Sequence, residues 1–446
     1  MSTRHFAAEG DGEDEEERKL VAAETGQIPI GEIAAAAKDA DRIPREIWIL
    51  IGATFFVAVG FALVVPVLPQ YAESFGVGAF LVSVVVSAFA FMRFITAPLG
   101  GVLVDRFGER PMYIAGLLIV ALSSFASAFA HSYVELLIFR GLGGIGSALF
   151  TLSASAMVVK YSPPRIRGRV TSLWSGTFLV GNISGPIFGG LLGQAGMAVP
   201  FFVYGCALVV AAIIVAVMLR GGRVRSSATG PKAPPMTFAD ALAIPAYRTS
   251  LLFGFANGWA NLGMRAAVIP LFVSQVVNDE PYAAGLVVAA AAIGMVLILQ
   301  WSGRASDHRG RRPLILAGLV VSAAAMVAMV WSHELWAVLL VSFVSGIGSG
   351  LCGPVSQAAV GDIIGPNRSG GRALSLFQML QDLGQIAGPM IAGLIIDLVN
   401  FELSFIVAAA VLLLPAIAWL FTRDTLPGPD AAGNETGPGQ RPSPVK

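Results

Sequence analysis

The chain is poor in charged residues. Asp, Glu, Lys and Arg make up 13% of its 446 residues, whereas a soluble protein carries about 25%. Hydrophobic residues make up 55%. A chain with so little charge must place much of its surface against lipid. The formal net charge is only +1, so no basic excess indicates a nucleic acid partner.

Cysteine and histidine are also scarce, and a nucleotide-binding loop is absent from the sequence. Cys206 and Cys352 both lie in apolar runs, where we interpret them as small buried side chains rather than as a disulfide or a metal site. The four histidines fall in the N-terminal tail or at loops, and no Walker-type Gly-Lys-Ser/Thr loop occurs. We therefore expect no metal, no cofactor, no ATP hydrolysis and no enzymatic activity.

Long apolar runs dominate the rest of the chain, and most reach the roughly 20 residues that a helix needs to cross a bilayer. The predicted spans are 47–69, 78–99, 112–131, 133–153, 170–194, 198–220, 249–275, 282–302, 313–331, 334–354, 373–397 and 402–421. The sequence thus predicts an all-α membrane protein of twelve transmembrane helices. The remaining segments are predicted as a polar acidic tail (1–46), a cytoplasmic central loop (221–248) and a disordered C-terminal tail (422–446).

Basic residues alternate between loops, which predicts the orientation. Every second loop carries Arg or Lys, and the intervening loops, near 70–77, 131–133, 195–197, 275–281, 331–334 and 397–402, contain neither. Because basic loops stay in the cytoplasm, we expect a multi-pass protein of the cell membrane with both termini cytoplasmic.

The second half of the chain repeats the first at a nearly fixed offset. Gly101, Asp105, Gly108, Arg110 and Pro111 recur 202 residues later as Gly303, Asp307, Gly310, Arg312 and Pro313. Gly185-Pro186 recurs 203 residues later as Gly388-Pro389. We interpret the membrane part as two six-helix pseudo-repeats, 47–220 and 249–421. Such repeats place the substrate site between the halves, near the bilayer midplane.

The repeated loop holds an acidic residue among basic ones. The first copy contains Gly101, Asp105, Arg106, Gly108 and Arg110, and the second contains Gly303, Asp307, Gly310 and Arg311. An Asp contributes nothing to orientation in a basic loop, and a glycine one turn away lets another helix approach. The loop resembles the signature of the major facilitator superfamily, G-x-x-x-D-R-x-G-R-R, from which Glu109 and His308 depart.

This resemblance implies the fold of that superfamily and a gate. In the family, the Asp and Arg of this loop form an ion-pair latch between helices of opposite halves, which holds the outward-facing state. Carried over, Asp105 is the expected latch residue, with Arg110 beside it and Arg372 as a partner at the start of the eleventh span. A partly buried pair of this kind can bias a two-state equilibrium enough to act as a gate.

Two further motifs lie within spans. Arg140 precedes a glycine-rich face, as in the family's fourth-helix motif, and we expect it to face a cavity or a partner; the alternative is snorkelling to the interface. Glycines spaced for close helix packing surround a proline in the fifth span and again in the eleventh. They are Gly181, Gly185, Pro186, Gly189 and Gly190, then Gly384, Gly388 and Pro389. This motif resembles the signature of the twelve-helix proton-coupled drug antiporters.

Acidic residues within spans are few, and proton coupling requires one that reaches water from each side in turn. Asp382 is the first candidate, because it lies about ten residues into the eleventh span and therefore near the midplane. It is flanked by Gln378, Gln381 and Gln385. Glu135 near the outer end of the fourth span is the second candidate, and a plain interfacial carboxylate is an equally good interpretation of it.

Polar residues in two other spans are candidates for the cavity. Asn257 and Asn261 share a face of the seventh span, Arg265 follows them one turn later, and Arg93 lies in the second span. Alternatives remain for each: asparagine pairs often join helices, and Arg93 can support the latch.

Together these features favour a secondary exporter of small amphipathic or drug-like molecules in exchange for protons. We expect it to act as a monomer in the lipid bilayer, by rocking of its two halves. A proton symporter or facilitator for a nutrient, sugar or lipid is the alternative on the same fold, and only the Gly-Pro motifs separate the two. A membrane-embedded sensor or enzyme has the least support.

Overall fold

The computed structural model describes residues 43–162, 167–219, 236, 238–365 and 371–425. The predicted tails beyond these ranges and most of the central loop lie outside the described residues. Every regular element among the described residues is a helix. The N-terminal helices are α3 (Arg45–Val64), α4 (Leu68–Glu73), α5 (Ala79–Phe107), α6 (Glu109–Ala128), α7 (Tyr133–Tyr161), α8 (Arg167–Gln194) and α9 (Val199–Met218). The C-terminal ones are α10 (Phe238–Ala243), α11 (Pro245–Asn257), η2 (Gly258–Met264), α12 (Val268–Phe272), η3 (Val273–Val277), α13 (Pro281–Arg309), α14 (Arg311–Met329), α15 (Leu335–Ile364), α16 (Gly371–Leu398) and α17 (Phe401–Leu420).

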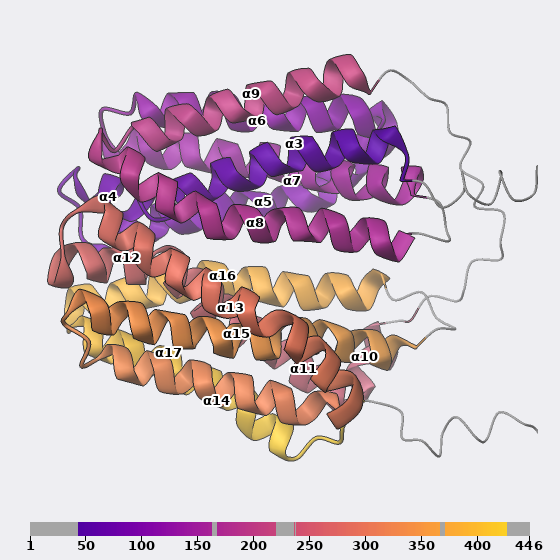
Figure 1. The fold of residues 1–446 in the computed structure, drawn as a ribbon, viewed down its shortest axis with the longest axis vertical. Coiled ribbons are helices and arrows are strands. Elements are labelled where there is room, and N and C mark those ends of the chain that lie inside the picture. Colours follow the sequence, from indigo (N-terminus) through magenta and orange to yellow (C-terminus); the bar gives the residue numbers. More distant parts are fainter. Residues whose placement is uncertain (1–42, 163–166, 220–235, 237, 366–370, 426–446) are drawn as a thin grey trace, which may run out of the picture.

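The helices form two bundles that lie side by side, one from each half of the chain (Figure 1). Each bundle has its own core. Leu50, Tyr113 and Leu117 belong to the N-terminal core, whereas Phe253 and Trp419 belong to the C-terminal one. Within the described ranges, eleven helices are long and apolar enough to cross a membrane. The 28-residue helix α8 takes the place of the fifth predicted span and packs along α3. The predicted all-α membrane fold is confirmed.

The internal repeat is confirmed by the helix boundaries. Helices α5, α6, α7 and α9 begin at residues 79, 109, 133 and 199, and α13, α14, α15 and α17 each begin 202 residues later. Gly108 and Gly310 occupy the same turn with φ of 89° and 93°, a conformation that glycine adopts without strain. The chain therefore has to keep glycine at this point in both copies of the loop.

Several helices extend beyond the predicted spans, among them α7, α13 and α15, which end at Tyr161, Arg309 and Ile364 rather than at 153, 302 and 354. Helix α5 continues to Phe107 rather than ending at 99, because hydropathy marks only the part of a helix that lies in lipid. The predicted span 249–275 begins earlier, at Pro245, and contains two π-helical stretches, η2 and η3. A π-helical turn shifts the register of the side chains that follow it, and such turns often occur at functional sites.

The glycine motifs pack helices closely, as predicted. A Cβ atom on Gly181 would lie 2.7 Å from the backbone of Ala58, and Gly185 and Gly189 face α3 in the same way. In the second half, Gly384 and Gly388 face Phe255 and Trp259. Gly190 is different, because it lies against Pro281 and Tyr282 of α13 and so contacts the other bundle. Pro186 and Pro389 both lie inside continuous helices.

Two long helix pairs make the most extensive contacts between the bundles, α5 with α16 and α8 with α13. We call the end of the bundles that holds Gly108 and Gly310 the basic end, and the end that holds residues 74–78 and 278–280 the opposite end. At the opposite end the halves are tightly joined. Leu271 of α12 is fully buried in the N-terminal core, and Gln275 donates a 2.8 Å hydrogen bond to Glu73 at the end of α4.

Candidate functional site

A cavity of about 720 Å³ lies between the two bundles. Helices α8, α11, η2, α13, α15 and α16 contribute its walls. Its lining residues on α16, Phe377 and Gln381, lie nearer to Gly371 at the basic end than to Leu398. The cavity is large enough for a drug-sized molecule, and it lies toward the basic end of the α16 helix.

Three residues predicted for the cavity meet on one wall of it. The Asn261 amide donates a 2.9 Å hydrogen bond to the Asn257 side-chain oxygen, which confirms that the two share a face. Arg265 lies one turn further along and donates to the Ser349 hydroxyl of α15 at 3.0 Å. All three line the cavity.

The residues Arg93 and Asp382 meet across the bundles. Arg93 Nη2 of α5 lies 2.8 Å from Asp382 Oδ1 of α16, and Gln378 donates to the same oxygen at 3.4 Å. The Asp382 side chain is 13% exposed and that of Arg93 31%. Both residues were predicted as site residues from the sequence, but their pairing was not. Gln381 instead lines the large cavity, and Gln385 faces the small cavity at Arg140.

The repeat makes this pair unusual. The residue 202 positions after Arg93 is Met295, and the residue 203 positions before Asp382 is Leu179. Both lie on the second cross-bundle helix pair, and both line the cavity. One of the two symmetry-related helix pairs therefore carries an ion pair where the other has apolar side chains.

Arg140 is buried inside the protein rather than extended to the membrane–water interface. Its side chain is 3% exposed, and its guanidinium lies 4.8 Å from the Phe89 ring centroid. The guanidinium borders a cavity of about 40 Å³ that is also lined by Gln385. Among the described residues Arg140 Nε has no hydrogen-bond partner. The structure therefore places Arg140 beside a small internal cavity, and a role for it in transport stays a prediction.

Glu135 has a local contact that accounts for its position. Its carboxylate accepts from the His131 backbone N–H at 2.8 Å, and the Ser132 hydroxyl accepts from the Glu135 N–H at 3.3 Å. Reciprocal bonds of this kind cap the start of a helix. These contacts correspond to the interfacial alternative for Glu135.

At the basic end, the ion pairs and hydrogen bonds of Arg110 and Arg311 join residues of the same bundle. Arg311 reaches Asp307 and Asp362 at 2.6 and 3.0 Å, and Arg110 donates to the Ala216 carbonyl at 2.6 Å. Asp105, Arg106 and Arg372 are exposed, and no hydrogen bond or ion pair joins Asp105 to any described residue. A Cβ on Gly101 or Gly303 would contact nothing within 4 Å, so the close approach predicted there is not made in this state. The predicted latch stays a prediction for a state in which the basic end is closed.

Asp397 makes a contact between the two bundles that could not be predicted from the sequence. Asp397 lies in the last turn of α16 and accepts hydrogen bonds from the backbone N–H groups of Ala79 and Phe80 at 2.8 and 2.9 Å. These two N–H groups open α5, whose N-cap residue Gly78 has no side chain to cap them. A carboxylate from one bundle therefore caps a helix of the other.

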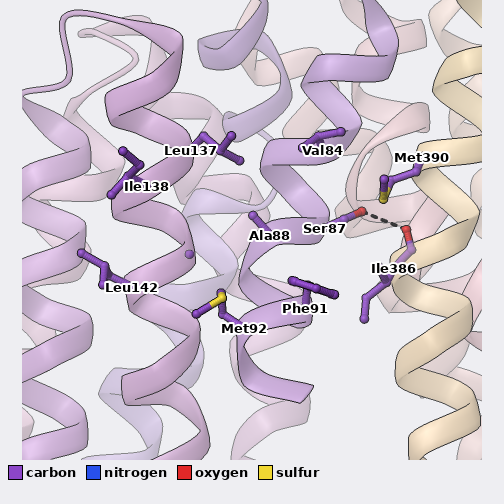
Figure 2. Close-up of a pocket in the computed structure, with 11 residues that line it drawn as sticks. Val84, Ser87, Ala88, Phe91, Met92, Leu137, Ile138, Leu142, Ile386 and Met390 are labelled. Carbon is purple, nitrogen blue, oxygen red and sulfur yellow. Dashed lines mark hydrogen bonds between the residues drawn. The ribbon is translucent and has the colours of Figure 1, made fainter. Parts of the chain in front are cut away.

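An apolar groove of about 510 Å³ runs along the outside of the α5–α16 pair, where α7 adjoins it (Figure 2). Ser87 crosses it with a 3.1 Å hydrogen bond to the Ile386 carbonyl. Phe91, Ile138 and Leu142 border it and are about half exposed. The helix pair thus presents apolar side chains to the membrane and the Arg93–Asp382 pair to the interior.

Comparison with known proteins agrees with this architecture. The family model described as Major Facilitator Superfamily matches residues 50–278 and 251–445. The chain belongs to the major facilitator superfamily. It is accordingly a multi-pass membrane transporter and not an enzyme.

Two bacterial drug-resistance proteins are among the relatives to which the chain is similar. The quinolone resistance protein NorA of Staphylococcus aureus is 24% identical over 354 residues, which cover 79% of this chain and 90% of NorA. Multidrug resistance protein 1 of Bacillus subtilis is 26% identical over 374 residues, 83% of this chain and 95% of that protein.

Solved structures share the fold. A bacterial homologue of the human lysosomal transporter Spinster, in an inward-facing and unoccupied conformation, matches with a TM-score of 0.71 at 17% identity, over 85% of this chain and 97% of that one. A D-xylose–proton symporter matches with a TM-score of 0.69 at 16% identity, over 85% and 98%.

Proposed function

We propose that this protein is a secondary exporter that moves small amphipathic or drug-like molecules out of the cell in exchange for protons. The resistance proteins to which it is similar support export rather than uptake. With the predicted orientation, the basic end is cytoplasmic, and the cavity between the bundles receives its substrate from that side.

The observation that carries the proton coupling is the Arg93–Asp382 ion pair. Asp382 is the one carboxylate in the central part of the membrane helices among the described residues, and its partner belongs to the other bundle. A proton on Asp382 removes the negative charge, so the attraction across the α5–α16 contact falls and the bundles can rearrange. Loss of the proton restores the pair. Each cycle would thereby link one rearrangement to the movement of protons.

Alternating access then follows from the two ends of the molecule. In the structure two contacts hold the bundles together at the opposite end. The Asp397 carboxylate of α16 bonds to the start of α5, and Gly190 of α8 packs against α13. Opening that end requires these contacts to separate, together with those of Leu271 and Gln275 with the N-terminal bundle. At the same time the exposed Asp105 and Arg372 come within reach of a partner at the basic end. The predicted latch belongs to that second state.

Transport by the purified protein in liposomes tests this proposal. A panel of fluorescent amphipathic compounds is offered to liposomes with an imposed pH gradient, and again without one. The proposal predicts accumulation of at least one compound against its concentration gradient only when the pH gradient is present, and reversal when the gradient is reversed. Equilibration that ignores the pH gradient would identify a facilitator instead.

A further inference from the structure

The cavity between the bundles carries an uncompensated positive charge. Arg265 lines it, and the hydroxyl of Ser349 is the hydrogen-bond partner of its guanidinium among the described residues. None of the described residues that line the cavity is an Asp or a Glu. A guanidinium inside a membrane protein is costly unless an anion or a polar cavity compensates it.

The nearby acidic residue is not available to Arg265. Asp382 is bonded to Arg93 and Gln378 and does not line the cavity, whereas its neighbour Gln381 does. Arg140 adds a second guanidinium at the interface between the bundles without a carboxylate partner among the described residues. The central part of the described helices thus holds three arginines, Arg93, Arg140 and Arg265, but one carboxylate, that of Asp382. The net charge of this region is therefore positive.

The other walls of the cavity offer hydrogen-bond donors and aromatic surface. Asn257 uses its side-chain oxygen for Asn261, which leaves its NH₂ group for a ligand. Gln300 and Gln381 add further amides, and Phe253 and Phe377 add rings. An aromatic body between such rings is stabilised by burial of apolar area.

From this arrangement we infer that the substrates of this cavity are aromatic compounds that carry a carboxylate, and that Arg265 binds that carboxylate. This inference rests on the proposed export function only for the direction of movement. A guanidinium fits a carboxylate with two parallel hydrogen bonds, and no acidic group in the described lining competes for it. A lipophilic cation has no described carboxylate to bind in this cavity and is repelled by Arg265, so the site discriminates by charge sign.

Equilibrium binding to the purified protein in detergent tests the inference without a proton gradient. Three probes share one fluorophore and differ in charge: dansylglycine (a carboxylate), dansylglycinamide (neutral) and a dansyl quaternary ammonium. We expect wild type to bind dansylglycine at least about tenfold more tightly than the amide. Arg265→Gln should remove that preference and leave the affinity for the amide unchanged. Arg265→Lys should retain part of it.

Arg248→Gln is the matched control, because Arg248 is an exposed arginine on α11, in the same membrane-spanning segment (Pro245–Val277) as Arg265, and it does not line the cavity. It should leave all three affinities as in wild type. Retained affinity for the amide shows that an Arg265→Gln sample is folded. The inference is overturned if Arg265→Gln keeps the full preference for dansylglycine, or if wild type prefers the quaternary ammonium. Because no pH gradient is applied, failure here leaves the proposed proton-coupled export untouched, and failure of gradient-driven transport leaves the charge preference standing.

Discussion

Arg93 Nη2 donates a 2.8 Å hydrogen bond to Asp382 Oδ1, and the two residues belong to different bundles. Their equivalents in the internal repeat, Met295 and Leu179, carry no charge. The fold is duplicated, but the ionisable contact is present in one copy alone. In the proposed mechanism, a rearrangement of α5 against α16 therefore depends on the protonation of a carboxylate, whereas the matching movement of α8 against α13 does not.

Removal of either partner should destabilise this state more than removal of both. Arg93→Gln leaves Asp382 without its cation, and Asp382→Asn leaves the guanidinium without its anion, whereas the double variant has neither charge. We expect a coupling free energy of about 1–3 kcal/mol between the two substitutions. Thermal unfolding of the four proteins in one detergent measures it. Strict additivity of the single effects would mean that the ion pair does not hold the bundles together.

Much of this architecture could be predicted from the sequence, because it depends on local composition. Apolar runs predicted twelve spans, and a described helix or helical segment corresponds to each of them, α8 included. The offset of 202 between Asp105 and Asp307 predicted the repeat. The positions of Asp382, Arg93 and Arg265 were also predictable, since a charged residue in an apolar helix is conspicuous.

The pairing of these residues could not be predicted. Arg93 and Asp382 are 289 residues apart, and only the packing of α5 on α16 brings them together. The role of Asp397 could not be predicted for the same reason, because its partners are backbone N–H groups of a distant helix. The π-helical turn η2, which sets the register of Arg265, has no signal in the hydrophobic pattern.

Loss of the Asp397 carboxylate should favour opening of the opposite end. Asp397→Ala leaves the first N–H groups of α5 without their acceptor, which costs about 1 kcal/mol in this state and shifts the population about fivefold. Spin labels at the opposite end of the two bundles should report a larger fraction of long distances. Asp397→Asn keeps an acceptor oxygen and should shift the distances less. Equal distance distributions in Asp397→Ala and wild type would exclude Asp397 from the gate.

Close helix packing makes Gly185 sensitive to a methyl group. A Cβ there would overlap Ala62 of α3, and overpacking of this kind costs about 1–3 kcal/mol. Gly185→Ala should therefore lower the melting temperature in detergent. Gly52→Ala on α3 is the matched control, because a Cβ there meets nothing within 4 Å and alanine favours helix. If both variants melt alike, the glycine motif does not serve packing.

The exposed Asp105 should matter in the other state. In the structure it contacts no described residue at the basic end, so Asp105→Ala should leave the contacts of this state intact. If Asp105 forms the predicted latch when the basic end closes, its loss should increase the population that is open at the basic end. Spin-label distances across that end measure the shift. Unchanged distances would mean that Asp105 is not a latch residue.

The most direct test of the account is gradient-driven transport by Asp382→Asn in liposomes, beside wild type and Glu135→Gln. Asn cannot take up or release a proton, whereas Gln at 135 keeps the oxygen that caps α7. We expect Asp382→Asn to exchange substrate down its concentration gradient but to accumulate none when a pH gradient is imposed, and we expect Glu135→Gln to accumulate substrate as wild type does. Accumulation by Asp382→Asn at the wild-type level would contradict the assignment of proton coupling to the Arg93–Asp382 pair.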